Sequence, residues 1–170
     1  MSVKTIRILA CALAATACAS ASAAPSGDQA VAVARALFAR ERLAAPDAIA
    51  IASQLPLKLV SGALRDDVCG EPASSRVQLL DLNGDRADEV IVVAGNACIS
   101  GMSGATLYVF AKQGNGWVQV LNVGAGGYEL LETRHQGWRD IALALGGRCS
   151  PVWGMVGREY DLVREVGQCN

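Results

Sequence analysis

The chain has 170 residues, with 15 lysines and arginines against 16 aspartates and glutamates, and a formal net charge of −1. This length suits a leader followed by one ordinary domain. The basic residues form no stripe along the sequence, which argues against a nucleic-acid-binding protein. The small excess of acidic residues does not by itself identify a partner.

Residues 1–23 are predicted to be a secretory signal peptide. Lys4 and Arg7 precede an apolar stretch at 8–17, and small residues follow up to Ala23. This order of charged, apolar and small-residue regions is typical of such signals. Cleavage after Ala23 would leave 13 basic against 16 acidic side chains. The apolar stretch is shorter than the roughly 20 residues that span a bilayer. We therefore expect a periplasmic or secreted protein of Gram-negative-type export, with no membrane span.

Lipidation at Cys18 is the alternative processing. Small residues precede this cysteine, as in lipoprotein signals, but Ala15 stands where leucine or valine is usual. Processing after Ala23 is therefore the preferred prediction. An acylated Cys18 would instead make the protein a lipid-anchored structural component of the envelope.

Residues 24–56 are predicted to form an N-terminal helical segment. Within 28–43, apolar residues recur on one helical face, at Ala30, Val33 and Leu37. Asp28 is a plausible N-cap, and Pro46 lies just beyond the end. A second short helix is predicted at 47–54. The alanine-rich face lacks the bulky apolar residues of a membrane-surface helix, so we expect it to pack against the protein.

Residues 57–170 are predicted to form a β domain. Short β-branched runs alternate there with glycine and polar turns, which predicts strands at 76–80, 89–94, 106–111, 117–122, 128–133, 140–145, 152–156 and 159–164. Evenly spaced short strands of this kind predict antiparallel sheet. The segment after Asp81 also matches the segment after Glu132, so that Glu89 corresponds to Asp140. This weak repeat predicts two blade-like units, with chance similarity between strand-turn-strand segments as the alternative.

Four cysteines follow the leader: Cys69, Cys98, Cys149 and Cys169. An even count in an exported chain predicts two disulfides, for which three pairings are possible. Pairing of neighbours, Cys69 with Cys98 and Cys149 with Cys169, is preferred because each bond would close one local unit. Each loop so closed would contribute roughly 3 kcal/mol to stability. A zinc site is the rival interpretation, although no two of these cysteines are closely spaced.

The loop DLNGDRADE, at 81–89, carries the clearest chemical signal. Alternate positions offer oxygen ligands, from the side chains of Asp81, Asn83, Asp85 and Glu89 and the carbonyl of Ala87. Gly84 permits the sharp turn that would aim them at one centre. Calcium prefers six to eight such oxygens, and a closed shell of this kind is structural. The alternative is a solvated turn in which Asp and Asn cap their own backbone.

The spacing of Asp81, Asn83, Gly84, Asp85 and Glu89, with an apolar strand following, resembles the calcium loops of FG-GAP and related β-propeller repeats. The helix-loop-helix calcium motif is excluded, because a valine occupies its twelfth position and a strand follows. The segments NACISGMSG, LYVFAKQGNGW and HQGWRDIAL further resemble a mostly uncharacterised family of small exported bacterial proteins. The resemblance implies a β-propeller-like fold. For some members it also implies inhibition of, or immunity to, cell-wall-degrading enzymes.

The sequence departs from this family at three places. Glycine is usual at the sixth loop position, where Arg86 stands, which predicts a strained turn or a weaker hold on the ion. A second cysteine is common in the segment just after Cys98, and residues 102–105 contain none here. In the second unit Glu132, Arg134 and Gln136 replace the ligand pattern, so no second ion is expected.

These features predict a non-enzymatic binding module, calcium-stabilised and disulfide-braced, whose loops at 70–75, 95–104 and 122–127 contact another periplasmic or secreted protein. The alternative is a metal-dependent periplasmic enzyme that uses the acidic loop. No catalytic residue is assigned. His135 is the single histidine and lies beside a turn, and no nucleophile turn such as Gly-x-Ser-x-Gly occurs.

Overall fold

The computed structural model describes residues 27–144 and 148–169. The predicted signal peptide and Cys18 lie outside these residues. The helical segments are α1 (Gly27–Leu37), α2 (Ala45–Ala52), α3 (Ala97–Ser100) and the 3₁₀ turn η1 (Gly101–Ser103). The strands are β1 (Leu57–Val60), β2 (Ala63–Asp66), β3 (Ser74–Leu80), β4 (Glu89–Gly95), β5 (Thr106–Gln113), β6 (Gly116–Gly124), β7 (Tyr128–His135), β8 (Trp138–Leu143), β9 (Cys149–Val156) and β10 (Glu159–Gly167). Within the described ranges, no helix is long and apolar enough to cross a membrane.

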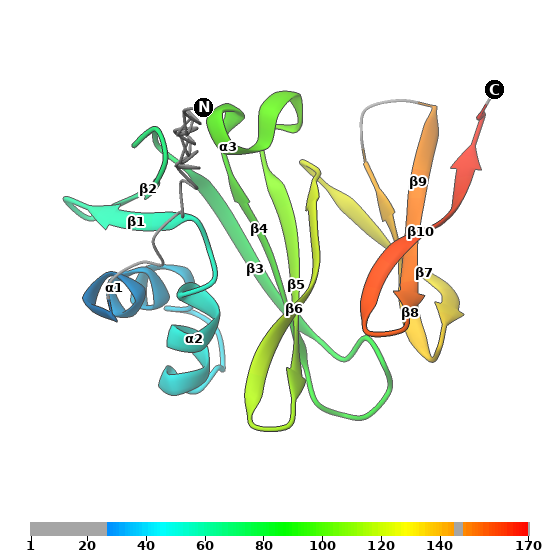
Figure 1. Cartoon of the computed structure of the whole chain (residues 1–170), viewed down its shortest axis with the longest axis horizontal. Coiled ribbons are helices and arrows are strands. Elements are labelled where there is room, and N and C mark those ends of the chain that lie inside the picture. Colours follow the sequence, from blue (N-terminus) through cyan, green and yellow to red (C-terminus); the bar gives the residue numbers. More distant parts are fainter. Residues whose placement is uncertain (1–26, 145–147, 170) are drawn as a thin grey trace, which may run out of the picture.

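Two four-stranded antiparallel sheets make up most of the molecule (Figure 1). One has the strand order β3-β4-β5-β6 and the other β7-β8-β9-β10, so each sheet pairs strands that are neighbours in sequence. A small third sheet holds β1 and β2. All eight predicted strands are present, and the prediction of a mainly β, antiparallel fold is confirmed. The described sheets form no closed ring, so the propeller-like arrangement stays a prediction.

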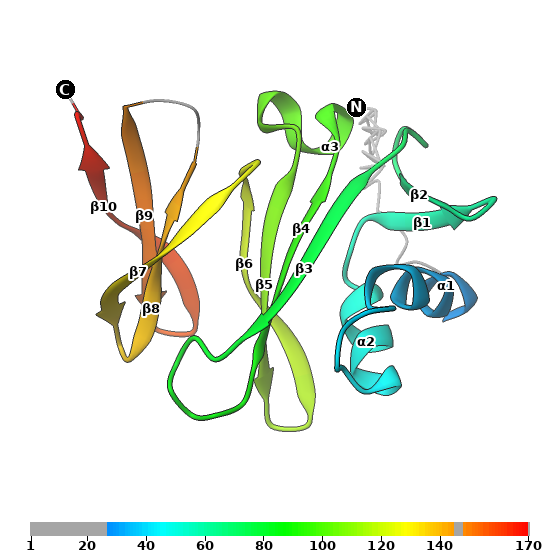
Figure 2. The same ribbon diagram turned by 180° about the vertical axis from the view of Figure 1, so that it is seen from behind.

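The sheet β3–β6 is the middle of three layers (Figures 1 and 2). The helices α1 and α2, with the β1–β2 hairpin, cover one face, and the sheet β7–β10 covers the other. Strand β4 is consequently buried at every position from Glu89 to Gly95. The core on the helix side includes Val33, Ile51, Val92 and Phe110. The core between the two sheets includes Leu82, Leu107, Ile141 and Tyr160.

The helical segment differs from the prediction at its boundaries. Helix α1 ends at Leu37, before the predicted end at residue 43, and α2 begins at Ala45. The chain turns back after Leu37 so that α2 can pack against α1, and the buried Phe38 points into the core at this turn. Pro46 lies in the first turn of α2, where its missing N–H costs no hydrogen bond.

Two elements were not predicted. The β1–β2 hairpin turns at Ser61 and Gly62, whose φ angles of 50° and 80° suit a two-residue hairpin turn. A Ser-Gly pair between two short apolar runs was the available signal. The short helix α3 is capped by the side chain of Asn96, which accepts hydrogen bonds from the N–H groups of Cys98 and Ile99.

The two disulfides pair neighbouring cysteines as predicted. Cys69–Cys98 joins the β2–β3 connection to α3, with the two Cα atoms 6.5 Å apart. Cys149–Cys169 joins the start of β9 to the chain beyond β10, with Cα atoms 4.8 Å apart. Such bonds persist in oxidising compartments, which agrees with an extracellular environment.

Candidate functional site

The predicted calcium loop connects β3 to β4 and fastens one sheet to the other. Leu82 is fully buried in the core between the sheets. Its carbonyl accepts hydrogen bonds from the backbone N–H of Arg139, at 2.9 Å, and from the guanidinium of Arg134, at 3.1 Å. Both arginines belong to the second sheet. A change in the loop conformation would therefore disturb the hydrogen bonds that join the two sheets.

The loop is shaped by its own acidic and amide side chains. The Asp81 carboxylate accepts hydrogen bonds from the N–H groups of Gly84 (2.6 Å) and Arg86 (2.9 Å). Asn83 accepts one from the N–H of Asp85, and Asp85 accepts one from the N–H of Ala87. These are the side-chain-to-backbone bonds of Asx turns. The alternative interpretation of the loop as a capped turn thus describes part of its geometry.

The structure brings together only part of the predicted ligand set. The Asn83 amide nitrogen donates to Asp85 Oδ2 at 3.1 Å and to Glu89 Oε1 at 3.2 Å, so two carboxylates flank this amide. Asp81 is directed to the backbone instead. Among the described residues, Asp81, Asp85 and Glu89 do not bring one oxygen each to within 4.8 Å of one another. Carboxylate and amide oxygens are the ligands that a hard cation such as calcium prefers. In this loop, however, these oxygens do not surround a common point.

The sixth loop position has the backbone conformation that glycine favours. Arg86 has a φ angle of 72°, and Gly84 has one of 84°. A residue with a Cβ pays a steric penalty of about 1 kcal/mol in this region. Arg86 therefore stands in a locally strained turn.

Glu89 is a buried carboxylate whose neighbours are negative. Its side chain is 3 % exposed and accepts a hydrogen bond from the N–H of Leu82 at 2.8 Å. Burial raises the pKa of Glu89, the Leu82 hydrogen bond opposes this, and the charges of Asp85 and Asp81 raise it further, to about 7. No lysine, arginine or histidine of the described chain forms an ion pair with Glu89. Its charge at neutral pH is therefore uncompensated, which is costly in a buried place.

Asp140 lies at the matching place of the second sheet and is compensated by its own neighbours. It is fully buried on β8, the second strand of its sheet, as β4 is of the first. His135 Nδ1 donates to one carboxylate oxygen at 2.7 Å, and Thr133 donates to the other at 2.6 Å. The guanidinium of Arg164 lies 3.6 Å away. Burial tends to raise the pKa of Asp140, but these hydrogen bonds and charges outweigh it and hold the pKa below its usual value.

Gly154 leaves room for this second cluster. A Cβ at Gly154 would stand 2.7 Å from His135 Nδ1 and 3.1 Å from Asp140 Oδ1. The sequence predicts His135 only as a turn residue. The missed signal was the aspartate five positions later, which a hairpin between β7 and β8 brings back to the histidine.

The three loops predicted to contact a partner lie together at the opposite end of the sheet from the acidic loop (Figures 1 and 2). We call these loops, 70–75, 95–104 and 122–127, together with residues 67–69 next to the first of them, the loop edge. The Asn96 amide donates to the carbonyls of Glu71 and Pro72, which joins the first two loops. The third loop lies against the second, because a Cβ at Gly126 would be 3.0 Å from the Ser103 carbonyl.

Asp66 makes the loop edge rigid. It is fully buried and accepts hydrogen bonds from the N–H groups of Cys69, Gly70 and Glu71 and from the Asn96 amide. Burial alone would raise the pKa of Asp66, but these hydrogen bonds lower it to about 2. Asp66 also lies close to the sulfurs of Cys69 and Cys98. Those sulfurs are bonded to each other, so this group is a structural brace and not a thiolate metal site.

The loop edge exposes apolar side chains on this rigid frame. Val68 is 69 % exposed and Met102 is fully exposed, on the two loops that the disulfide joins. The charged side chains of the loop edge are Asp67 and Glu71, both acidic. An apolar, acidic and braced edge has the character of a contact surface.

Comparison of the chain with protein-family models, with curated proteins and with solved structures gave no match.

Proposed function

We propose that the chain is an exported, calcium-stabilised and disulfide-braced binding module that inhibits, or gives immunity to, a cell-wall-degrading enzyme. The observation that carries the proposal is the loop edge, where Val68 and Met102 project from loops held by a disulfide and by Asp66. Binding loses less conformational entropy when a contact surface is ordered in advance. A braced edge with exposed apolar side chains is therefore suited to recognition of another protein.

The charge of the loop edge supports a basic partner. Asp67 and Glu71 are the charged residues of the loop edge and form no ion pair with a described residue, and Arg65 borders the edge through a hydrogen bond to the Gly70 carbonyl. Complementary charge steers association and excludes wrong partners more than it adds affinity. Val68 and Met102 would supply the affinity as apolar anchors, since a methionine adapts to an irregular pocket. A basic hydrolase with an apolar cleft meets both requirements.

Calcium has a structural place in this proposal. The oxygens of Asp85, Asn83 and Glu89 would hold the ion, with Asp81 and the Ala87 carbonyl completing the set. The support is the uncompensated charge of buried Glu89 beside two other carboxylates. The loop lies at the end of the sheet remote from the loop edge, so a bound ion would stabilise the contact between sheets without touching the partner.

Inhibition of a basic muramidase acting on cell-wall material tests the proposal. The mature protein in calcium-containing buffer is expected to inhibit the enzyme and to bind it in a calorimetric titration. Met102→Lys is expected to weaken binding roughly 30-fold, as loss of a buried anchor does. Val156→Lys is the matched control, because Val156 is 47 % exposed but lies on the second sheet.

Melting temperatures of both variants should equal that of the parent, since both positions are exposed. The inhibitor role is wrong if the parent leaves the muramidase active. The assignment of the loop edge is wrong if Met102→Lys and Val156→Lys inhibit equally well.

A further inference from the structure

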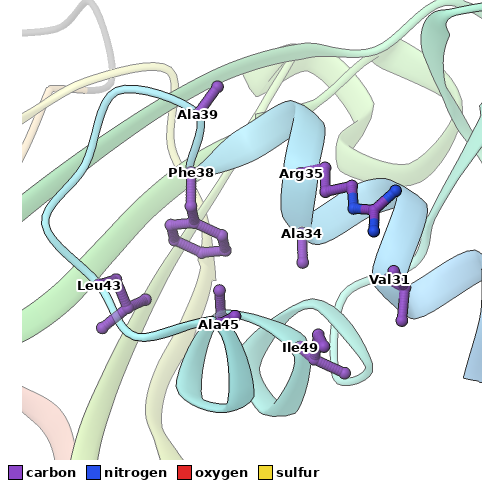
Figure 3. Close-up of a pocket in the computed structure, with 9 residues that line it drawn as sticks. Val31, Ala34, Arg35, Phe38, Ala39, Leu43, Ala45 and Ile49 are labelled. Carbon is purple, nitrogen blue, oxygen red and sulfur yellow. The ribbon is translucent and has the colours of Figure 1, made fainter.

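An apolar pocket of about 310 Å³ opens between α1 and α2 (Figure 3). Helix α1 contributes Val31 and Ala34, the turn after it contributes Phe38, and α2 contributes Ala45, Ala48 and Ile49. The alanines leave space that larger side chains would fill, and the Phe38 ring closes one side of it. Pockets for small molecules range from roughly 300 to 1,000 Å³. This pocket is at the lower limit, which suits one alkyl chain.

The pocket carries positive charge on its α1 side. Arg35 lies one helical turn after Val31, so both side chains line the same face. Arg35 is exposed and forms no ion pair with a described residue. Arg35 is the one charged residue among those that line the pocket, whereas the whole chain has a net charge of −1. The apolar lining and the local charge together fit a ligand with an apolar tail and an anionic head.

We propose that this pocket binds a single-chain anionic amphiphile, with the alkyl chain between α1 and α2 and the anionic head at Arg35. This binding is separate from the proposed contact at the loop edge, which lies on loops that do not line the pocket. The titrated chain is the mature protein, because residues 1–23 are predicted to be removed on export. The other candidate occupant is a second copy of the chain, which sedimentation distinguishes from a small amphiphile.

Calorimetric titration of the mature protein with decanoate, below its micellar concentration, tests the proposal. Saturable binding of one decanoate is expected, and decyltrimethylammonium, with the same chain and a positive head, should bind at least tenfold more weakly. Ala45→Trp should abolish binding, because Ala45 is exposed and lines the pocket without belonging to the core. Ala36→Trp is the matched control, since Ala36 is exposed on α1 but does not line the pocket.

Arg35 is tested separately from the pocket. Arg35→Gln should weaken decanoate binding about tenfold, while Arg40→Gln, an exposed arginine outside the lining, should leave it unchanged. Unaltered melting temperatures show that the variants fold. The proposal is overturned if Ala45→Trp binds decanoate as tightly as the parent does. It is equally overturned if the parent binds decanoate and decyltrimethylammonium with the same affinity. It is also overturned if sedimentation shows a dimer that Ala45→Trp dissociates.

Discussion

Glu89 and Asp140 are buried carboxylates at corresponding places in two sheets of the same plan, yet their surroundings differ in charge. Asp140 is hydrogen-bonded to His135 and lies near Arg164, and its pKa is held low. Glu89 has Asp81 and Asp85 as neighbours, and its pKa is raised to about 7. The second sheet thus supplies a guanidinium and hydrogen-bond donors for its buried carboxylate, whereas the first supplies no cation.

This difference points to Glu89 as the buried carboxylate that a bound cation would neutralise. A buried charge is tolerated when it is paired, and the described chain pairs only one of the two.

Calcium should stabilise the mature protein through Glu89 and its loop. When the free calcium concentration is about 100 times the dissociation constant, calcium binding adds about 2.7 kcal/mol to the free energy of unfolding. This corresponds to a rise of roughly 10 °C in melting temperature, measured by calorimetry with and without a chelator. Magnesium should do little, because it needs stricter geometry and gives up water reluctantly.

Two loop variants separate a bound ion from a general salt effect. Asp85→Ala should abolish the calcium response. Asp88→Ala removes an exposed acid of the same loop that lies outside the predicted ligands, and it should retain the response. An equal response in both variants would show that the ion site is wrongly assigned.

Asp140→Asn should destabilise the protein by about 2 kcal/mol, because one charge-assisted hydrogen bond is lost and Arg164 loses its buried partner. Urea unfolding at pH 7 measures the change. Asp161→Asn, an exposed acid on β10, should change stability by less than about 0.5 kcal/mol. Equal losses in the two variants would contradict the role given to the His135–Asp140 pair.

Glu89→Gln should have the opposite sign to Asp140→Asn. Without calcium at pH 8 it should stabilise the protein by about 1 kcal/mol, because an uncompensated buried charge is removed. In the parent, folded Glu89 has a pKa of about 7 against an ordinary value of 4.5. The folded state therefore binds more protons between these values, and stability is lost as pH rises from about 4.5 to about 7.

Urea unfolding in chelator across that pH range measures this loss. The loss should disappear in Glu89→Gln, and calcium should reduce it in the parent. A parent protein whose stability stays flat from pH 4.5 to 7 in chelator would show that Glu89 titrates normally.

Arg86→Gly should have the smallest effect, a gain below about 1 kcal/mol. Glycine relieves the left-handed strain at φ 72°, although it also increases the entropy of the unfolded chain. Arg86→Ala keeps the Cβ and should give no gain. Calcium affinity should rise only in the glycine variant if the strain weakens the loop, and titration of both variants with calcium measures this.

Local patterns predicted much of the fold. Strand runs, turn glycines and cysteine spacing were sufficient for the eight strands of the two large sheets and for both disulfides, because meander sheets and neighbour disulfides depend on contacts close in sequence. Other contacts depend on segments that only folding brings together. These are the hydrogen bonds around Asp66, including the one from Asn96, and those that Arg134 and Arg139 donate to the Leu82 carbonyl. Spacing alone placed Asp81 with Asp85 and Glu89, but it could not show that the Asp81 carboxylate is engaged by the backbone.

The meander arrangement has a consequence for how the chain folds. Each of the two large sheets pairs strands that follow one another directly, so each strand can dock on the one just completed. Such short-range pairing lowers the loop-closure cost and favours rapid folding. The first sheet can thus assemble before the second has folded, and the later half can form on a surface that is already in place.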